Sequence, residues 1–330
     1  MLKFFSKIWL CALILAVLSP KVFAEDKNPV NFRAVGGAVM GGTWNVGFTA
    51  LAKLLRDIYP GSNVNVLLGA SVSNPLKLET NGGDVTATQS FNITAGLRGE
   101  PPFKKPLQEI SSIANVNDTT VVHLIVSDKV DANSLEEIVE KKIPIRLDPG
   151  AKSTLSNILG EMLLKELGAS YSDIAKWGGR VTPVSGADRT GMMQDGTINA
   201  AFILGSLEQP QLQEMVINSG IKWITVNPET LKKIADKTGL KIIDIPAGLY
   251  NGAVGRNVAA LADTVHIIAR KDMPEDDVYK ITKTLAEGHE YIGEVQPMWK
   301  TLRPETMPKD LIAPLHPGAE RYYREEGLLK

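Results

Sequence analysis

The chain has 330 residues, with 36 Lys and Arg against 37 Asp and Glu, 44% hydrophobic residues and a single Cys. This near-neutral balance gives no reason to expect nucleic acid or an anionic membrane surface as a partner. A chain of this length can stabilise itself by burial alone, as one large domain or as two domains of ordinary size.

Residues 1–24 have the pattern of a cleavable secretory signal peptide. Two lysines precede an unbroken apolar run of 11 residues (8–18), and residues 22–24 offer a signal peptidase site before Glu25. The run is shorter than the roughly 20 apolar residues that a membrane-spanning helix needs; an uncleaved N-terminal anchor is the alternative. Cys11 lies inside the run, which is a poor position for lipidation. We therefore predict a mature periplasmic protein of 306 residues without Cys, in which 33 basic residues face 37 acidic ones because three Lys leave with the signal.

Three units, each a strand, a polar loop and a helix, precede residue 100. Apolar residues at 32–35, 64–68 and 85–88 predict the strands. Asn74-Pro75 is typical of a helix start, with Asn as the cap and Pro at the first helical position. Gln89-Ser90 leads into the third helix, so the three units indicate alternating strands and helices.

The same unit recurs twice after residue 140. A strand at 144–147 is followed by the loop 148–153 and a helix, and a strand at 198–204 is followed by Gly205 and another helix. Five repetitions of one strand–loop–helix event predict an α/β fold.

Two further apolar runs, 121–126 and 265–269, predict strands long enough to pass from one lobe to another. We therefore predict two α/β lobes, each a mostly parallel sheet flanked by helices, joined by these two hinge strands. The first lobe is expected to hold residues 25–125 and 262–330, and the second lobe residues 126–261.

The loops that follow the strands are rich in Gly, Ser, Thr and Asn, and ligands bind there in parallel α/β sheets. Helix N-termini at these loops present N–H groups and a partial positive charge, which suits a carboxylate or a phosphate. Hydroxyl and amide donors are supplied by Ser71, Ser73, Asn74, Gln89 and Ser90.

Each of these features has a second interpretation. Loop glycines can simply turn the chain, and residues 71–74 can simply cap a helix. Lys152 can be a solvated lysine, and Trp44 can belong to the core.

No catalytic or metal-binding motif is evident in the sequence. Residues 146–153 depart from a phosphate-binding loop, because Arg146 stands at the first glycine position and Gly is absent just before Lys152. Residues 69–73 miss the last Gly of G-x-S-x-G. The four His show no metal-ligand spacing; His123 and His266 lie in apolar strands, which indicates packed core or hinge residues. We therefore predict a binding protein that needs no cofactor, and not an enzyme.

Seven motifs stand in order along nearly the whole mature chain, at 35–47, 71–74, 83–90, 148–153, 195–205, 245–250 and 315–323. Each motif alone is weak, but the ordered set resembles the TAXI-type solute receptors of the TRAP (tripartite ATP-independent periplasmic) transporters. The resemblance implies a periplasmic-binding-protein fold of type II that closes on its ligand and delivers it to a membrane permease driven by an ion gradient, often sodium.

Ligands of similar receptors are mostly small carboxylates, with glutamate and 2-oxoglutarate prominent. The expected ligand-binding residues, taken from the loops and from the resemblance, are Gly42, Thr43, Trp44, Gly47, Ser71, Ser73, Asn74, Gln89, Ser90, Gly150, Lys152, Ser153 and Gly205.

The chain departs from the usual pattern at positions that bear on ligand identity. Trp44 and Asn45 stand where similar proteins have two tyrosines, Phe91 stands where an Asp is usual, and Lys152 stands where a glycine is usual. We expect an anionic ligand such as a dicarboxylate, with Lys152 as its counter-charge, a TRAP-type permease as partner, and a monomer. A periplasmic protein that reports ligand occupancy to a membrane sensor is one alternative, because it would share the cleft, and a periplasmic enzyme is the other.

Overall fold

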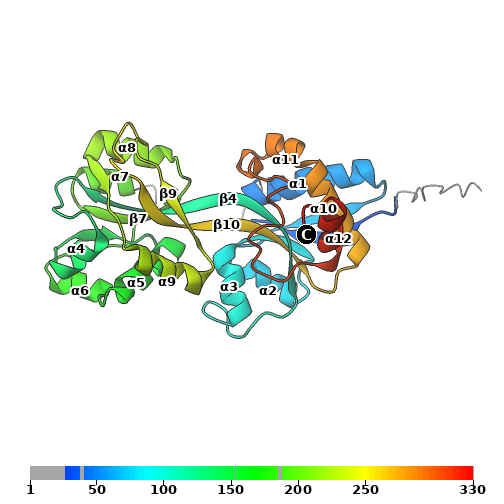
Figure 1. Ribbon diagram of the computed structural model, residues 1–330, viewed down its shortest axis with the longest axis horizontal. Coiled ribbons are helices and arrows are strands. Elements are labelled where there is room, and N and C mark those ends of the chain that lie inside the picture. Colours follow the sequence, from blue (N-terminus) through cyan, green and yellow to red (C-terminus); the bar gives the residue numbers. More distant parts are fainter. Residues whose placement is uncertain (1–26, 38–40, 153, 185–187, 330) are drawn as a thin grey trace, which may run out of the picture.

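The computed structural model describes residues 27–37, 41–152, 154–184 and 188–329. The predicted signal peptide lies outside the described residues. Figure 1 shows two lobes joined by two long strands, β4 (Ile110–Ser127) and β10 (Val258–Arg270).

The first lobe combines the beginning and the end of the chain. Its elements are β1 (Asn31–Val35), α1 (Thr43–Ile58), β2 (Asn63–Leu67), α2 (Ser73–Glu79), β3 (Val85–Gln89), α3 (Ser90–Arg98), α10 (Glu275–Glu287), α11 (His289–Val295), the 3-10 helix η1 (Pro297–Trp299) and α12 (Pro317–Glu325). Helices α1 and α11 lie on one side of the sheet, and α2 and α3 lie on the other side (Figure 1).

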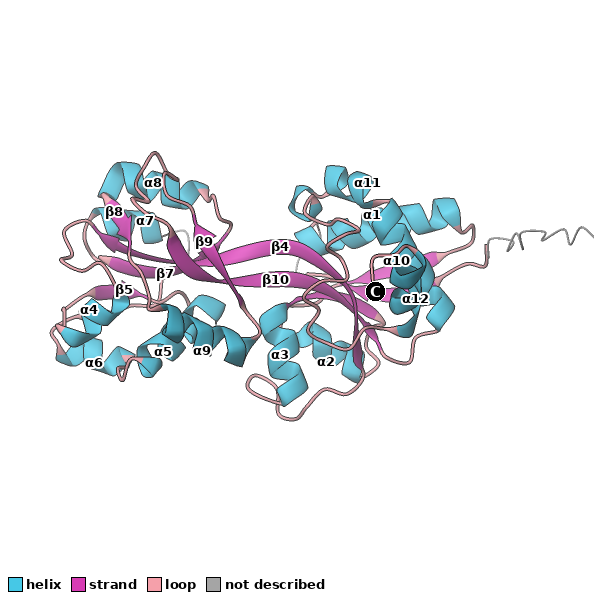
Figure 2. Cartoon of the chain, viewed as in Figure 1, coloured by secondary structure: helices cyan, strands magenta, loops and turns pink. Residues whose placement is uncertain are grey.

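The second lobe is formed by the middle of the chain. Its elements are α4 (Leu135–Glu140), β5 (Arg146–Asp148), α5 (Leu155–Glu166), α6 (Tyr171–Lys176), β6 (Arg180–Val181), α7 (Arg189–Gln194), β7 (Ala200–Gly205), α8 (Pro210–Ser219), β8 (Ile221–Trp223), α9 (Pro228–Thr238) and β9 (Lys241–Ile245). Figure 2 shows α7 and α8 on one side of the strands and α4, α5, α6 and α9 on the other.

One sheet of 10 strands runs through both lobes, in the order β2-β1-β3-β10-β4-β7-β5-β6, with β8 beside β4 and β9 beside β10. Strands β1, β2 and β3 are parallel to one another, as are β5, β6 and β7. The hinge strands β4 and β10 run antiparallel to each other and to the neighbouring strands β7 and β3. The two predicted parallel sets are therefore present, and the hinge strands join them into one continuous sheet.

The two-lobed α/β architecture and the five predicted strand–loop–helix units are confirmed. Both hinge strands are longer than the predicted runs at 121–126 and 265–269. Strand β4 starts at Ile110, where Ser111 and Ser112 interrupt the apolar pattern although both side chains are buried. The predicted lobe boundaries fall inside β4 and β10, so the exact division between the lobes stays a prediction.

Each lobe has its own hydrophobic core. In the first lobe Phe48, Leu51 and Leu55 of α1 pack with Trp299 and Tyr323, all fully or almost fully buried. In the second lobe one cluster contains residues of α5, β7 and α9, and another contains residues of α8, β8 and β9. Burial of each Leu or Phe contributes about 1.5–3 kcal/mol. Phe91 of α3 in the first lobe belongs to the cluster that contains α5, β7 and α9, so the two cores are in contact.

Candidate ligand-binding site

The carboxyl ends of the two parallel strand sets meet near the middle of the hinge strands. Strand β3 ends at Gln89, which pairs with Val265 of β10. Strand β7 ends at Gly205, which pairs with Val121 of β4, and Val121 pairs with Ala262 of β10. Positions 262 and 265 are about 10 Å apart along a strand. The loops after β1, β2 and β3 therefore face the loops after β5 and β7, as ligand sites in open α/β sheets require.

The first lobe contributes an open cavity of about 310 Å³ at the ends of β1 and β2. It is lined by Gly37, Thr43, Trp44, Ala70 and Ser71. Three predicted site residues, Thr43, Trp44 and Ser71, are therefore brought together although they come from two separate loops.

Gln89 is connected to this cavity by a polar cluster. The Ser71 hydroxyl donates to Gln89 Oε1 at 2.6 Å and accepts from Asn92 Nδ2 at 2.7 Å. Ser73 stands beside it, partly exposed, with its hydroxyl 3.2 Å from the Ala70 carbonyl. Asn92 was absent from the predicted site, because position alone does not distinguish it from other polar residues of α3.

Asn74 has a different role from the one predicted. It is fully buried, and α2 begins at Ser73 without a side-chain cap, so the predicted helix cap is wrong. Its Oδ1 accepts from the Ala70 backbone N–H at 2.8 Å, and its Nδ2 donates to the carbonyls of Gly36 at 2.9 Å and Ala87 at 3.2 Å. Asn74 thus ties the loops after β1 and β2 to strand β3, and its amide is used inside the protein.

Helix α1 holds the loop after β1 in place. Asn45 is buried and its Oδ1 accepts from the Gly37 backbone N–H. Gly42 precedes α1, and its carbonyl accepts from the Val46 N–H at 3.0 Å. Gly47 differs from its predicted role as a ligand contact, since a Cβ there would lie 2.7 Å from the buried ring of Trp299. Gly47 is therefore a packing residue.

Ser90 is directed into the protein and not toward the cleft. It is 1% exposed, and its hydroxyl donates to Oδ1 of Asp263 on β10 at 2.5 Å. The Phe91 backbone N–H donates to the same oxygen at 3.2 Å. Complete burial outweighs these hydrogen bonds and raises the pKa of Asp263 to about 6. Asp263 therefore occupies the N-terminus of α3, and the predicted contact between Ser90 and ligand does not agree with this geometry.

In the second lobe a buried ion pair fixes the loop after β5. Asp148 is fully buried and accepts from Arg189 Nε at 2.5 Å, and from the N–H groups of Gly150 at 2.7 Å and Val184 at 3.0 Å. Gly150 has a φ of +88°, and a Cβ there would lie 2.3 Å from Ser156 Oγ. Arg189 was not predicted from the sequence, because 41 residues separate it from Asp148.

Lys152 lies on the exposed tip of this loop, two residues before Thr154, the cap of α5. Its ammonium forms no ion pair with any carboxylate in the described part of the chain. Ser153, also a predicted site residue, lies outside the described residues. Lys152 is thus exposed to solvent, and its role toward a ligand stays a prediction.

A buried aromatic network fixes the loop after β7. Nε2 of His123 donates to the Ser206 carbonyl at 3.0 Å, and its Nδ1 accepts from the Trp223 indole at 3.2 Å. Trp223 stacks on Tyr250 with ring centroids 4.9 Å apart, and the Tyr250 hydroxyl accepts from the Gln209 N–H at 2.9 Å. Burial lowers the pKa of His123 to about 4, so the ring stays neutral. His123 is a packed core residue, as predicted.

Gly205, at the end of β7, leaves room for the Gln209 side chain. A Cβ at Gly205 would lie 1.7 Å from Oε1 of Gln209, because the Gln209 side chain folds over this glycine. Gly205 therefore shapes the end of β7 through a close approach.

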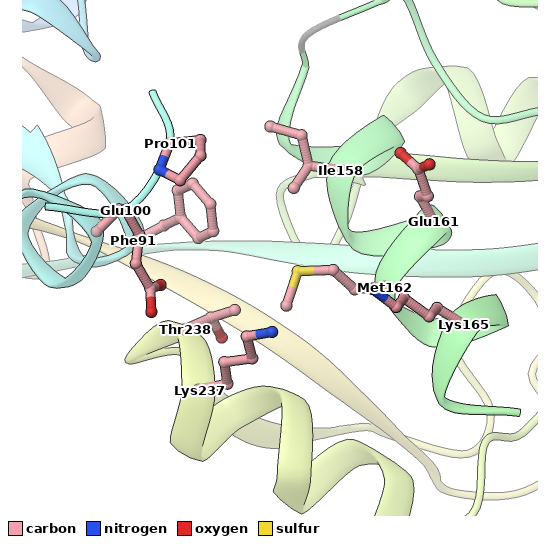
Figure 3. Close-up of a pocket in the computed structure, with 10 residues that line it drawn as sticks. Phe91, Glu100, Pro101, Ile158, Glu161, Met162, Lys165, Lys237 and Thr238 are labelled. Carbon is pink, nitrogen blue, oxygen red and sulfur yellow. The ribbon is translucent and has the colours of Figure 1, made fainter. Parts of the chain in front are cut away.

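A cavity of about 360 Å³ lies between the lobes. Phe91 of α3 and Met162 of α5 face each other across it, and the Lys237 side chain of α9 enters from below (Figure 3). The other lining residues are Ala95, Glu100, Pro101, Ile158, Glu161, Lys165 and Thr238. Phe91 stands out in the sequence as a departure from the usual pattern, but this cavity was not predicted.

The fold and the facing strand ends define the class: a two-lobed periplasmic-binding-protein fold. A TctC solute binding protein from Polaromonas has a TM-score of 0.53 at 14% identity, over 84% of this chain and 88% of that chain. PhnD1 from Prochlorococcus marinus, in complex with methylphosphonate, has a TM-score of 0.50 at 12% identity, over 92% and 100%. A Xanthomonas citri protein bound to ATP has a TM-score of 0.51 at 10% identity, over 91% and 97%. At these identities the likeness shows the fold.

The sequence matches the NMT1-like family over residues 35–327, and the chain belongs to this family. None of the helices in the described part of the chain has the length and apolarity to span a membrane. The described residues also contain no group of three or more His, Cys, Asp or Glu side chains placed to hold a metal ion.

Proposed function

We propose that this protein is a periplasmic solute-binding receptor. In this proposal it captures a small organic anion between its lobes and delivers it to a membrane permease. The observation that carries the proposal is the meeting of two sets of strand ends across the interlobe space, with helix N-termini on both sides. Such a cleft can surround a small ligand with backbone N–H groups from both lobes.

The distribution of acidic residues favours an anionic ligand. Helices α1, α5 and α8 begin at strand ends that face the opposite lobe, and none has an acid in its first turn. Helices α9, α10 and α12 begin elsewhere and each has one or more. An acid in the first turn neutralises the positive end of a helix. The helices at the cleft therefore keep a partial positive charge for a ligand, except α3, whose N-terminus binds Asp263.

Lys152 is the proposed counter-charge on the second lobe. Its exposed ammonium stands on the loop that faces the first lobe, and charge-assisted hydrogen bonds are about twice as strong as neutral ones. Two proteins of the same fold bind methylphosphonate and ATP, so this fold accommodates anions. From the resemblance to TAXI-type receptors we propose a small organic carboxylate as ligand, and a TRAP-type permease as partner of the monomeric receptor.

A ligand screen tests the proposal. Residues 25–330, shown to be folded and free of carried-over ligand, are heated with carboxylates, phosphonates, amino acids and neutral sugars. A ligand at 100 times its Kd stabilises the fold by about 2.7 kcal/mol, which raises the Tm measurably. We expect shifts with anions and none with neutral sugars. A shift produced by sugars alone would contradict the anion assignment.

Calorimetry on a confirmed ligand then tests the counter-charge. Lys152→Ala is expected to weaken binding about tenfold, whereas Lys129→Ala, which removes an exposed lysine at the far end of β4, is expected to leave the Kd unchanged. Equal affinities for wild type and Lys152→Ala would exclude the proposed role of Lys152.

A further inference from the structure

The interlobe cavity is closed on one side by direct contact between the lobes. Arg98, at the end of α3 in the first lobe, donates to the carbonyls of Lys237 and, at 3.3 Å, Asp236 at the end of α9 in the second lobe. Gly239, which follows α9 with a φ of +73°, lies against Thr94 of α3, where a Cβ would be 2.0 Å from Oγ1. The cavity is thus a pocket with walls from both lobes and a fixed side.

The walls that face each other are apolar. Phe91 is 9% exposed, and its backbone N–H is held by Asp263, so the ring has a fixed base on the first lobe. Met162 and Ile158 project from the same face of α5 on the second lobe (Figure 3). Met adapts to irregular apolar shapes, and a pocket of about 360 Å³ has the size of small-molecule sites.

Unpaired cations complete the cavity. The ammonium groups of Lys165 and Lys237 form no ion pair with any described residue, and the Lys237 side chain extends into the space (Figure 3). Glu100 and Glu161 also contribute to the lining, so the pocket is not strongly cationic throughout. A second carboxylate packed against the apolar side chains of Phe91 and Met162 would lose part of its hydration, which is costly, whereas an alkyl or aryl group there gains burial energy.

We propose that the cavity between α3, α5 and α9 binds the apolar part of an amphipathic monocarboxylate, with Phe91, Ile158 and Met162 around its chain or ring. This inference rests on the proposed receptor function and specifies its ligand class. Lys237 supplies the counter-charge at the pocket, and the apolar walls select against a distal second charge.

Calorimetry with matched ligands on residues 25–330 tests the inference. The probes are butyrate, hexanoate and octanoate, and the dicarboxylates adipate and suberate, which have the same chain lengths as hexanoate and octanoate. Affinity is expected to rise about 4-fold for each added CH₂, which corresponds to about 0.8 kcal/mol, and octanoate is expected to bind at least tenfold more tightly than suberate. Phe91→Ala and Met162→Ala are expected to reduce the gain per CH₂.

A control variant and the contrary outcomes make the test specific. Ile217→Ala removes an apolar side chain that is 69% exposed on α8 and is expected to leave the chain-length dependence unchanged. Met162 is partly exposed on α5, so its variant retains the fold even if Phe91→Ala does not. Tight binding of glutamate, 2-oxoglutarate or suberate with no chain-length dependence would overturn this inference and leave the receptor function standing. Folded protein that binds none of these carboxylates and none of the anions of the thermal screen would overturn both.

Discussion

Removal of the Asn74 amide should destabilise the first lobe far more than removal of an exposed amide nearby. Asn74 is fully buried and is bonded to Ala70, Gly36 and Ala87. The Ala87 carbonyl also accepts from Thr86 Oγ1 at 3.1 Å, so Asn74→Ala leaves two backbone groups without the bonds they now make. The Gly36 carbonyl is buried, and an unsatisfied buried group costs about 1–3 kcal/mol, whereas the partly buried Ala70 N–H costs less. We therefore expect the free energy of unfolding to fall by about 2–4 kcal/mol.

Urea denaturation followed by Trp fluorescence measures this loss. The matched control is Asn65→Ala, because Asn65 is an exposed amide on β2 of the same lobe and such surface changes stay within about 0.5 kcal/mol. If the free energy of unfolding falls by less than 1 kcal/mol for Asn74→Ala, or by the same amount for both variants, the stabilising role that we assign to the Asn74 hydrogen bonds is wrong.

Three further predictions concern a packing contact and two buried ionisable groups. Gly47→Ala places a methyl group 2.7 Å from the Trp299 ring and should lower the free energy of unfolding by about 1–3 kcal/mol without changing the Kd of the ligand. Weaker ligand binding with an unchanged Tm would instead show that Gly47 belongs to the binding site. Asp263 has a raised pKa of about 6, so the stability that its protonated carboxyl contributes is present at pH 4 and is lost as the pH rises through 6. Over that range the free energy of unfolding of Asp263→Asn should rise by up to about 3 kcal/mol relative to wild type. Stability curves of the two proteins that run parallel with pH would contradict this prediction. His123 has a lowered pKa of about 4, so the free energy of unfolding of wild type should fall by up to about 3 kcal/mol relative to His123→Asn as the pH falls from 6.5 to 4. If the urea midpoints of the two proteins differ by the same amount at every pH, this prediction is wrong.

The architecture was predictable because it depends on local periodicity. Runs such as 64–68 and 85–88 mark strands β2 and β3 by themselves, and the loops between strands and helices contain the Gly, Ser and Asn that turns require. Helix α9 is likewise bounded by local signals. Asn227 is its hydrogen-bonded cap, Pro228 is its first residue, and Gly239 follows its end in a left-handed conformation. The start of β4 was missed because Ser111 and Ser112 are buried polar residues within a strand.

The candidate site was predictable only in part, because the role of a side chain depends on its distant partners. Thr43, Trp44 and Ser71 lie together as the loops indicated. Ser90, however, is bonded to Asp263, 173 residues away, and Gly47 is packed against Trp299. A local motif identifies a loop residue as polar or small, but it does not determine whether the side chain points to a ligand or to the protein.

The interlobe cavity was not predictable from motifs for the same reason. Its walls come from α3, α5 and α9, whose apolar residues are each consistent with an ordinary helix face. The contact between Arg98 and the end of α9 brings these helices together, and no local pattern in either segment indicates it.

Hydrogen–deuterium exchange with and without the ligand from the screen tests the central claim, that an anion binds between the strand ends of both lobes. Amides in closed loops exchange more slowly, since exchange reports local opening. We predict slower exchange on binding in the loops at 68–72 and 89–91 of the first lobe together with 149–154 and 205–209 of the second. Protection confined to one lobe, or absent from all of these loops at saturating ligand, would contradict the proposed site.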